Sequence, residues 1–301
     1  MNKANIQLAE NLTFSRFSHG YWRAHKWQLP TKQYTQLIEN VLELGITTFD
    51  HAACYGGFTN ETAFGNALAD NPELRGKMQI VSKCGILFPN GTFPEMQSKH
   101  YDNSREHIIW SAERSVRELR CGYLDVLLVH RPSPCADPEE IAAAFDHLHR
   151  AGTVRHFGVS NYSPAKLNML QSYLSQPLVT NQIEISPLHL NAFEQDLDYL
   201  LEKRIKPMAW SPLGGGRLFD ADNERSRRIQ AALLKIGEKY GETRLDTLAY
   251  AWLLSHPAHI MPVIGSGRIE RIKNAADALK LDFTEEDWIG IYSASMGHDV
   301  P

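Results

Sequence analysis

The feature that most constrains the fold of this chain is the alternation of short apolar runs with helix-like segments along its 301 residues. The runs are nearly uninterrupted, as expected of parallel strands that are covered by helices on both faces. The alternation repeats about eight times without a Pro-rich linker or a change in composition. The sequence predicts strands at residues 14–20, 46–50, 78–83, 124–130, 156–160, 178–184, 205–210 and 260–265.

Three of the intervening segments have recognisable helix ends. One begins at Thr31 and stops at Gly45, and a second spans residues 104–122. The third has Asp137 where an N-cap is expected, Pro138 at the first helical position and a glycine after its end. These signals predict helices between the strands.

Eight strands alternating with helices predict an α/β fold, a (β/α)8 TIM barrel, as a single domain over residues 1–301. The alternative is an open, doubly wound sheet, which normally carries a GxGxxG phosphate loop after its first strand. The chain contains no such motif. In a barrel, the chemistry is expected at the carboxyl ends of the strands, where all the loops converge.

Composition excludes several classes of function. A formal net charge of -4 gives no general attraction to nucleic acid. The amino-terminal segment has no signal-peptide core, and no apolar stretch reaches the roughly 20 residues of a spanning helix. The four cysteines show neither paired nor zinc-like spacing. We therefore expect no nucleic acid or membrane partner, no metal and a cytoplasmic location.

Polar residues stand at or just after three consecutive predicted strands. Lys83 closes one run and needs a negative partner, which Asp50 at the end of the preceding run can supply. Tyr55 follows in the next loop, where a nearby cation would lower the pKa of its phenol and fit it for proton transfer. His130 would add a neutral hydrogen-bond donor. Each residue alone has an ordinary structural explanation, but their shared position does not.

The motifs FDHAACYGG, IVSKCG, DVLLVHRP, FGVSNYSP, NQIE, WSPLGGG and VIGSGRIERI occur in one order along almost the whole chain. In this respect the sequence resembles the aldo-keto reductases, and within them the bacterial YdhF-like oxidoreductases. The resemblance implies a (β/α)8 barrel, a nicotinamide cofactor bound without a Rossmann domain, and a catalytic tetrad of Asp50, Tyr55, Lys83 and His130.

The resemblance also implies where the cofactor binds. Short polar groups at two strand ends suit a carboxamide, an aromatic residue would stack on the nicotinamide ring, and glycines would let backbone amides approach a pyrophosphate. A basic segment at a helix start could hold the extra phosphate of NADPH. The implied contacts are Tyr21, Trp22, Ser160, Asn161, Gln182, Trp210, Ser211, Leu213, Gly214, Gly216, Gly265, Ser266, Arg268 and Arg271.

The expected activity is NADPH-dependent reduction of a small-molecule aldehyde or ketone, with Tyr55 as the general acid. One alternative is a nicotinamide-binding regulatory or sensor protein of the same fold with little turnover. A metal-dependent barrel hydrolase would need clustered His and carboxylate ligands, and only His130 stands in a suitable place.

The first predicted strand departs from the pattern of many family members. This departure places His19 and Trp22 near the expected nicotinamide. Loop residues expected at the substrate pocket are Trp22, Phe58, Phe88, Arg131 and His189. The physiological substrate and the oligomeric state stay open at this level.

Overall fold

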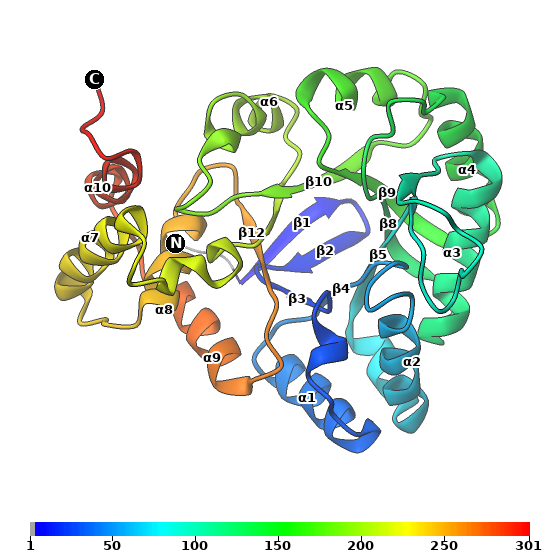
Figure 1. Cartoon of the computed structure of the whole chain (residues 1–301), viewed down its shortest axis with the longest axis horizontal. Coiled ribbons are helices and arrows are strands. Elements are labelled where there is room, and N and C mark those ends of the chain that lie inside the picture. The colour runs from blue at the N-terminus through cyan, green and yellow to red at the C-terminus, as the bar shows by residue number, and fades with distance from the viewer. Residues whose placement is uncertain (1–3) are drawn as a thin grey trace.

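The computed structural model describes residues 4–301, whose central feature is a closed barrel of eight parallel strands (Figure 1). The strands follow one another around the barrel in chain order with a crossover between successive strands, and the last barrel strand pairs with the first to close the barrel. The barrel strands are β3 (Ser18–Gly20), β4 (Thr48–Asp50), β5 (Gln79–Cys84), β8 (Leu124–Val129), β9 (Val154–Ser160), β10 (Leu178–Glu184), β11 (Met208–Trp210) and β12 (Met261–Ile264).

Helices surround the barrel, and two further helices, α7 and α10, pack together beside it (Figure 1). The α-helices are α1 (Thr31–Glu43), α2 (Asn60–Asp70), α3 (Arg105–Leu119), α4 (Pro138–Arg150), α5 (Pro164–Gln171), α6 (Asp196–Glu202), α7 (Glu224–Tyr240), α8 (Leu245–Leu254), α9 (Ile269–Asp277) and α10 (Glu285–Met296). Short 3-10 turns are η1 (Ala24–Lys26), η2 (Pro72–Lys77), η3 (Asn191–Phe193), η4 (Gly214–Phe219) and η5 (Ala278–Lys280). Within residues 4–301, no helix combines the length and apolar character that crossing a bilayer requires.

The predicted strand that corresponds to β8 and the predicted starts of α3 and α4 are confirmed. Burial explains the strand, and side-chain caps explain the helix starts. All six residues of β8 are buried, because helices cover this strand outside and other strands face it inside. The side chain of Asp137 accepts a hydrogen bond from the Glu139 amide at the start of α4, and Ser104 caps α3 in the same way.

The prediction of one strand over residues 14–20 is wrong. Phe14 and Ser15 belong to an antiparallel hairpin of β1 (Asn5–Ala9) and β2 (Leu12–Ser15), and the barrel strand begins only at Ser18. The Ser15 hydroxyl donates to the Phe17 carbonyl and accepts from the Thr47 and Thr48 amides, so it holds a bend between the two strands.

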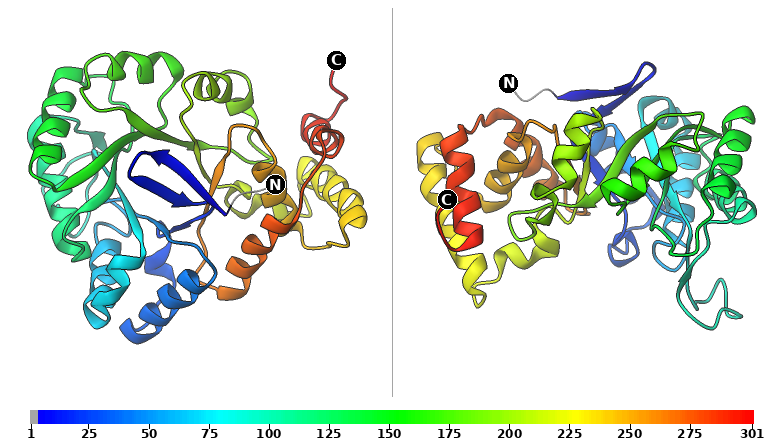
Figure 2. Two further views of the ribbon diagram at one scale, coloured as in Figure 1. Left: turned by 180° about the vertical axis from the view of Figure 1, so that it is seen from behind. Right: turned by 90° about the horizontal axis from the view of Figure 1, so that it is seen from above.

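This amino-terminal hairpin closes one end of the barrel (Figure 2). Ile6, Leu12 and Phe14 pack against the apolar side chains inside the barrel, including Val81 and Val126. With that end covered, the opposite end, formed by the carboxyl ends of the strands, is left for binding. A smaller hairpin of β6 (Ile86–Leu87) and β7 (His100–Tyr101) lies in the loop after β5.

Close packing between α2 and α3 leads to a first testable prediction. A Cβ on Gly65 of α2 would lie 1.9 Å from the backbone oxygen of Glu118 in α3. We expect Gly65→Ala to lower the free energy of unfolding by about 1 to 3 kcal/mol, because backbone must move to admit the methyl group. Urea unfolding would measure this loss. Gly76→Ala is the control, since no atom lies within 4 Å of its added Cβ. Equal stabilities of the two variants would contradict the packing argument.

Candidate active site

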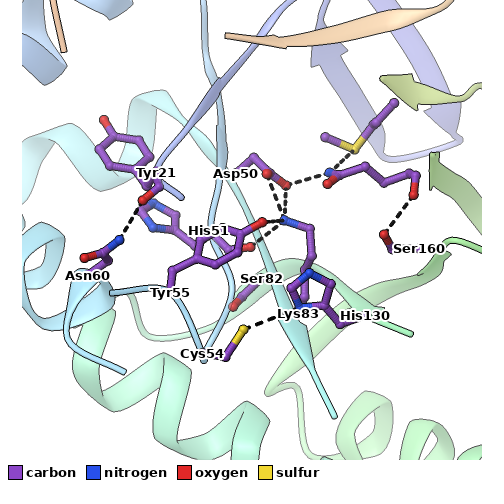
Figure 3. Close-up of polar contacts among 12 residues, drawn as sticks. Tyr21, Asp50, His51, Cys54, Tyr55, Asn60, Ser82, Lys83, His130 and Ser160 are labelled. Atoms are coloured by element: carbon purple, nitrogen blue, oxygen red, sulfur yellow. Dashed lines mark hydrogen bonds and ion pairs between the residues drawn. The ribbon is translucent and has the colours of Figure 1, made fainter. Parts of the chain in front are cut away.

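A buried lysine at the end of β5 organises the site (Figure 3). Lys83 Nζ lies 2.8 Å from both carboxylate oxygens of Asp50 at the end of β4, 2.8 Å from the His51 carbonyl and 3.1 Å from the Tyr55 hydroxyl. Lys83 donates in each of these bonds. The phenol oxygen of Tyr55 is therefore an acceptor from Lys83, and its own proton stays available for another partner.

The charges of this cluster balance one another. Burial lowers the pKa of Lys83, and the adjacent Asp50 carboxylate opposes that shift. Burial raises the pKa of Tyr55 well above its ordinary value, and the negative charge of Asp50 adds to the rise. The sequence-based expectation of a lowered tyrosine pKa is thus wrong in direction, because burial desolvates the phenol and Asp50 places a negative charge near it. Tyr55 is consequently held in its protonated form.

Gln182 in β10 is a further support that the sequence did not assign to the tetrad. Its side-chain amide donates to Asp50 Oδ1 at 2.8 Å. Asp50 Oδ1 also accepts from Lys83, so the amide helps to hold the carboxylate that pairs with the lysine. Its only sequence signal is its place among the polar residues of β10, whose sequence is LVTNQIE.

His130 completes the cluster from the end of β8. Its ring lies edge-on to Tyr55, with 5.8 Å between centroids. Burial, followed by the charge of Lys83, lowers the pKa of His130 well below its usual value, so the imidazole is neutral. Cys54 Sγ lies 3.7 Å from Nδ1, and burial raises the pKa of this thiol to about 12. A protonated thiol beside Nδ1 favours the tautomer with its proton on Nε2.

A cavity of about 950 Å³ opens onto this cluster, near the upper end of the roughly 300–1,000 Å³ usual for ligand pockets. Asp50, Tyr55 and His130 lie on its wall, while Lys83 sits behind them. The cavity extends from the tetrad to the start of α9. Of the residues implied as cofactor contacts, the following line it: Trp22, Ser160, Asn161, Gln182, Trp210, Ser211, Leu213, Gly216, Gly265, Ser266 and Arg271.

Three of the implied cofactor contacts do not line the cavity. Tyr21 is fully buried, with its ring stacked on His51. Gly214 is buried against Leu188, and Arg268 is an exposed N-cap residue of α9. Among the expected substrate-pocket residues, Trp22, Phe88 and Arg131 line the cavity.

The other two expected pocket residues face elsewhere. Phe58 is buried against Phe88 and Phe93. His189 lies near Glu184, outside the cavity lining.

A chain of hydrogen bonds fixes the indole of Trp210 in β11. Its Nε1 donates to Asn161 Oδ1 at 3.0 Å, and the Asn161 amide donates to Ser160 Oγ at 2.8 Å. Ser160 in turn donates to the backbone oxygen of Gln182. The sequence suggested that the side chains of Ser160 and Asn161 bind a carboxamide. Part of their hydrogen-bonding capacity is instead used to hold the Trp210 indole in the wall of the cavity.

The buried His19 supports the loop before α9 rather than the cavity. Its Nε2 lies 2.8 Å from the Ser266 carbonyl, and its Nδ1 lies 2.9 Å from the Tyr21 hydroxyl. Since a carbonyl only accepts, Nε2 carries the proton and the Tyr21 hydroxyl donates to Nδ1. Trp27 stacks on His19 and also covers Gly267, where an added Cβ would lie 2.7 Å from the indole.

The glycine-rich loop after β11 has an unusual backbone. Gly214, Gly215 and Gly216 all have positive φ, from 61° to 103°. L-residues with side chains rarely adopt this conformation. An added Cβ on Gly216 would meet no atom within 4 Å, so this stretch of backbone is open to a neighbouring group. Among the described residues, no cluster of three or more His, Cys, Asp or Glu side chains could hold a metal ion.

Comparison with known proteins places this geometry in a family. The model of the aldo/keto reductase family matches residues 17–295. The chain belongs to the aldo/keto reductase family. Aldo/keto reductases are oxidoreductases, and members of the family use nicotinamide cofactors. The barrel and the sequence-based assignment to this family are therefore confirmed.

Full-length relatives refine the placement. The chain is 48% identical to the uncharacterized oxidoreductase YcsN of Bacillus subtilis over 98% of this chain and 99% of that protein. It is 47% identical to the oxidoreductase YdhF of Escherichia coli, with 96% of each chain covered. A protein from Agrobacterium fabrum named 6-dehydroglucose reductase is 44% identical over 98% of this chain and 99% of its own length.

Proposed function

We propose that this aldo/keto reductase is an NADPH-dependent enzyme that reduces an aldehyde or ketone to an alcohol, with Tyr55 as the general acid. The observation that carries the proposal is the Tyr55 hydroxyl on the cavity wall, held from behind by the buried Lys83–Asp50 pair. A bound nicotinamide would supply the hydride.

Each member of the tetrad has a distinct task in this proposal. The Nε2–H of neutral His130 hydrogen-bonds the substrate carbonyl oxygen and orients it. Tyr55 then gives its proton to the oxygen on which negative charge develops. Lys83 stabilises the resulting tyrosinate through its hydrogen bond, and Asp50 keeps the lysine charged despite its burial.

Three features support a dinucleotide in the same cavity. The open backbone of Gly216 suits a pyrophosphate, because consecutive amides can approach it closely. Trp210, fixed through Asn161, offers a flat face for the nicotinamide ring. Arg271 lines the far end of the cavity, where Ser266 accepts a hydrogen bond from the Arg268 amide at the start of α9.

The preference for NADPH over NADH leads to a prediction about α9. If the Arg268 guanidinium binds the 2′-phosphate, Arg268→Ala should weaken NADPH binding by about 1.5 to 3 kcal/mol and leave NADH binding almost unchanged. We expect Arg271→Ala to weaken both cofactors, because Arg271 lines the cavity itself. Tryptophan fluorescence titration with each nucleotide would measure these affinities.

Lys273→Ala is the matched control on the same helix, since it also removes an exposed cation two residues beyond Arg271. It should bind both nucleotides as the unmodified protein does. Equal losses for NADPH and NADH in Arg268→Ala would contradict the proposed phosphate contact.

The substrate class can be tested with a panel of aldehydes and ketones, following the absorbance of NADPH. The relative named 6-dehydroglucose reductase supports including sugar-derived aldehydes. We expect sustained NADPH oxidation with at least one carbonyl in the panel. A panel without any turnover, in a protein that binds NADPH, would contradict the proposed reductase activity.

We further propose that one barrel domain over residues 1–301 carries this activity and that the protein works in the cytoplasm. Its four cysteines are all free thiols, as a reducing compartment would keep them.

A further inference from the structure

Two cationic side chains reach the cavity at the end that holds Tyr55 and His130. Arg131 directly follows His130 after β8, and Lys99 precedes β7 in the loop after β5. Both line the cavity. Arg131 is half-buried and Lys99 is exposed. Their positive charges both act on His130, whose pKa is lowered chiefly by burial.

Neither cation has an acidic partner in the part of the chain that the structure describes. Within residues 4–301, no carboxylate forms an ion pair with Arg131 or Lys99. Of the carboxylates on the cavity wall, Asp50 is already paired with Lys83. Asp246 accepts a hydrogen bond from Asn274. Asn274 lies in α9 together with Arg271, at the other end of the cavity. The end of the cavity that holds Tyr55 and His130 therefore has an excess of positive charge.

The main chain fixes the position of Arg131. Its backbone oxygen accepts a hydrogen bond from the Asn103 side-chain amide at 3.1 Å, and the amide of the preceding His130 donates to the Cys84 carbonyl at 3.0 Å. The guanidinium carbon lies 5.9 Å from the centroid of the Trp210 ring, whose orientation is itself fixed. No hydrogen bond from the guanidinium to another described residue is found at this site. A half-buried guanidinium with free donors is well suited to a planar anion, which it binds through two parallel hydrogen bonds.

We propose that Arg131, assisted by Lys99, forms an anion subsite that selects carbonyl substrates carrying a carboxylate or phosphate group. The subsite rests on the proposed reductase function and specifies its substrate class. Arg131 makes the direct contact, whereas the exposed Lys99 attracts the substrate through a field that salt screens. The cofactor phosphates are assigned elsewhere, to the glycine loop and the start of α9, so they do not compete for Arg131.

The test compares two aldehydes of nearly equal shape, 4-formylbenzoate and its neutral analogue 4-formylbenzamide. We expect the unmodified enzyme to have the higher kcat/KM with the carboxylate. Arg131→Gln should lower kcat/KM for the carboxylate by roughly tenfold to a hundredfold and change that for the amide by less than about threefold. Using the ratio of the two aldehydes cancels their difference in intrinsic reactivity.

Matched variants separate the subsite from general effects of charge or folding. Arg155→Gln removes an arginine that also lies over an aromatic ring, but near the beginning of β9 and outside the cavity. It should keep the carboxylate preference. Arg131→Lys keeps the charge but loses the planar fork, so it should retain part of that preference. Lys99→Gln should mainly weaken the dependence of the carboxylate rate on ionic strength.

A second pair identifies which anion is preferred, and it also tests a neutral polyhydroxylated substrate. Glyceraldehyde 3-phosphate and glyceraldehyde differ only in the phosphate. A larger effect of Arg131→Gln on the phosphate pair than on the benzoate pair would assign the subsite to phosphate, and the reverse would assign it to carboxylate. Equal losses with charged and neutral aldehydes would overturn the proposal while leaving the reductase function intact.

A binding measurement keeps the proposal testable apart from turnover. Tryptophan fluorescence should detect 4-formylbenzoate binding to the NADP+ complex, and Arg131→Gln should weaken it at least tenfold relative to 4-formylbenzamide. If no carbonyl in the wider panel is reduced but this difference appears, the reductase function fails and the anion subsite stands. If both aldehydes bind equally, the subsite is refuted.

Discussion

Tyr55→Phe should lower kcat for carbonyl reduction by roughly 100-fold to 10,000-fold, because it removes a general acid and almost no volume. Lys83 and Asp50 stay paired in this variant, since their mutual bonds do not involve the phenol. The affinity for NADPH should therefore change little. Steady-state NADPH oxidation gives the rate, and fluorescence titration gives the affinity.

Tyr34→Phe provides the matched control for this substitution. Tyr34 is also buried, but its hydroxyl has no hydrogen-bond partner among the described residues. Removing that hydroxyl should leave kcat and stability nearly unchanged. If Tyr55→Phe keeps most of the activity, Tyr55 is not the proton donor.

Lys83→Met should reduce kcat by a comparable factor, because the Tyr55 oxygen loses its cationic donor and Asp50 is left as an unpaired buried carboxylate. Asp50→Asn should be nearly as harmful, since burial already lowers the pKa of Lys83 and the variant removes the carboxylate that opposes this shift. Each single variant should also lose about 3 to 5 kcal/mol of stability, as expected when a buried ion pair loses one partner.

The double variant, Lys83→Met with Asp50→Asn, tests whether the two residues act as a pair. With both charges gone, neither is left uncompensated, so the combined loss in kcat/KM and in unfolding free energy should be much smaller than the sum of the two single losses. Losses that add independently would show that Asp50 and Lys83 do not act as a unit.

The arrangement of the barrel could be predicted from the sequence because a local run of apolar residues marks most of its strands. A buried run such as that of β8 reads directly as a covered parallel strand, and caps such as Asp137 mark where helices begin. The amino-terminal hairpin was missed because the bend at Ser15 depends on bonds to Thr47 and Thr48, more than thirty residues away. Only the folded chain brings these groups together.

In the candidate site, too, the features marked by local sequence could be predicted, and those that depend on distant contacts could not. The tetrad could be located because three members stand at or next to the end of a strand, Tyr55 lies in the loop that follows β4, and parallel strands end on one face of the barrel. The environment of Tyr55 could not be foreseen, since its pKa depends on how completely the ring is buried and on the negative charge of Asp50 nearby. Likewise, no local pattern shows that the Gln182 amide is committed to Asp50.

Loop residues were the least predictable. Phe58 and His189 were expected at the substrate pocket, but one packs into an apolar cluster and the other lies beside Glu184. Both belong to loops whose paths depend on long-range contacts. Arg131 was easier to place because it lies two residues beyond the end of β8.

The central claim is that this aldo/keto reductase carries hydride from a nicotinamide to a carbonyl carbon over many catalytic cycles. The most direct measurement supplies NADPH deuterated on the transferring face of nicotinamide C4, together with an aldehyde that the enzyme accepts, and follows the alcohol by mass spectrometry. The account predicts one deuterium on the former carbonyl carbon and many product molecules per protein chain. Alcohol without deuterium would contradict hydride transfer, and product limited to about one molecule per chain would instead identify a nicotinamide-binding sensor with little turnover.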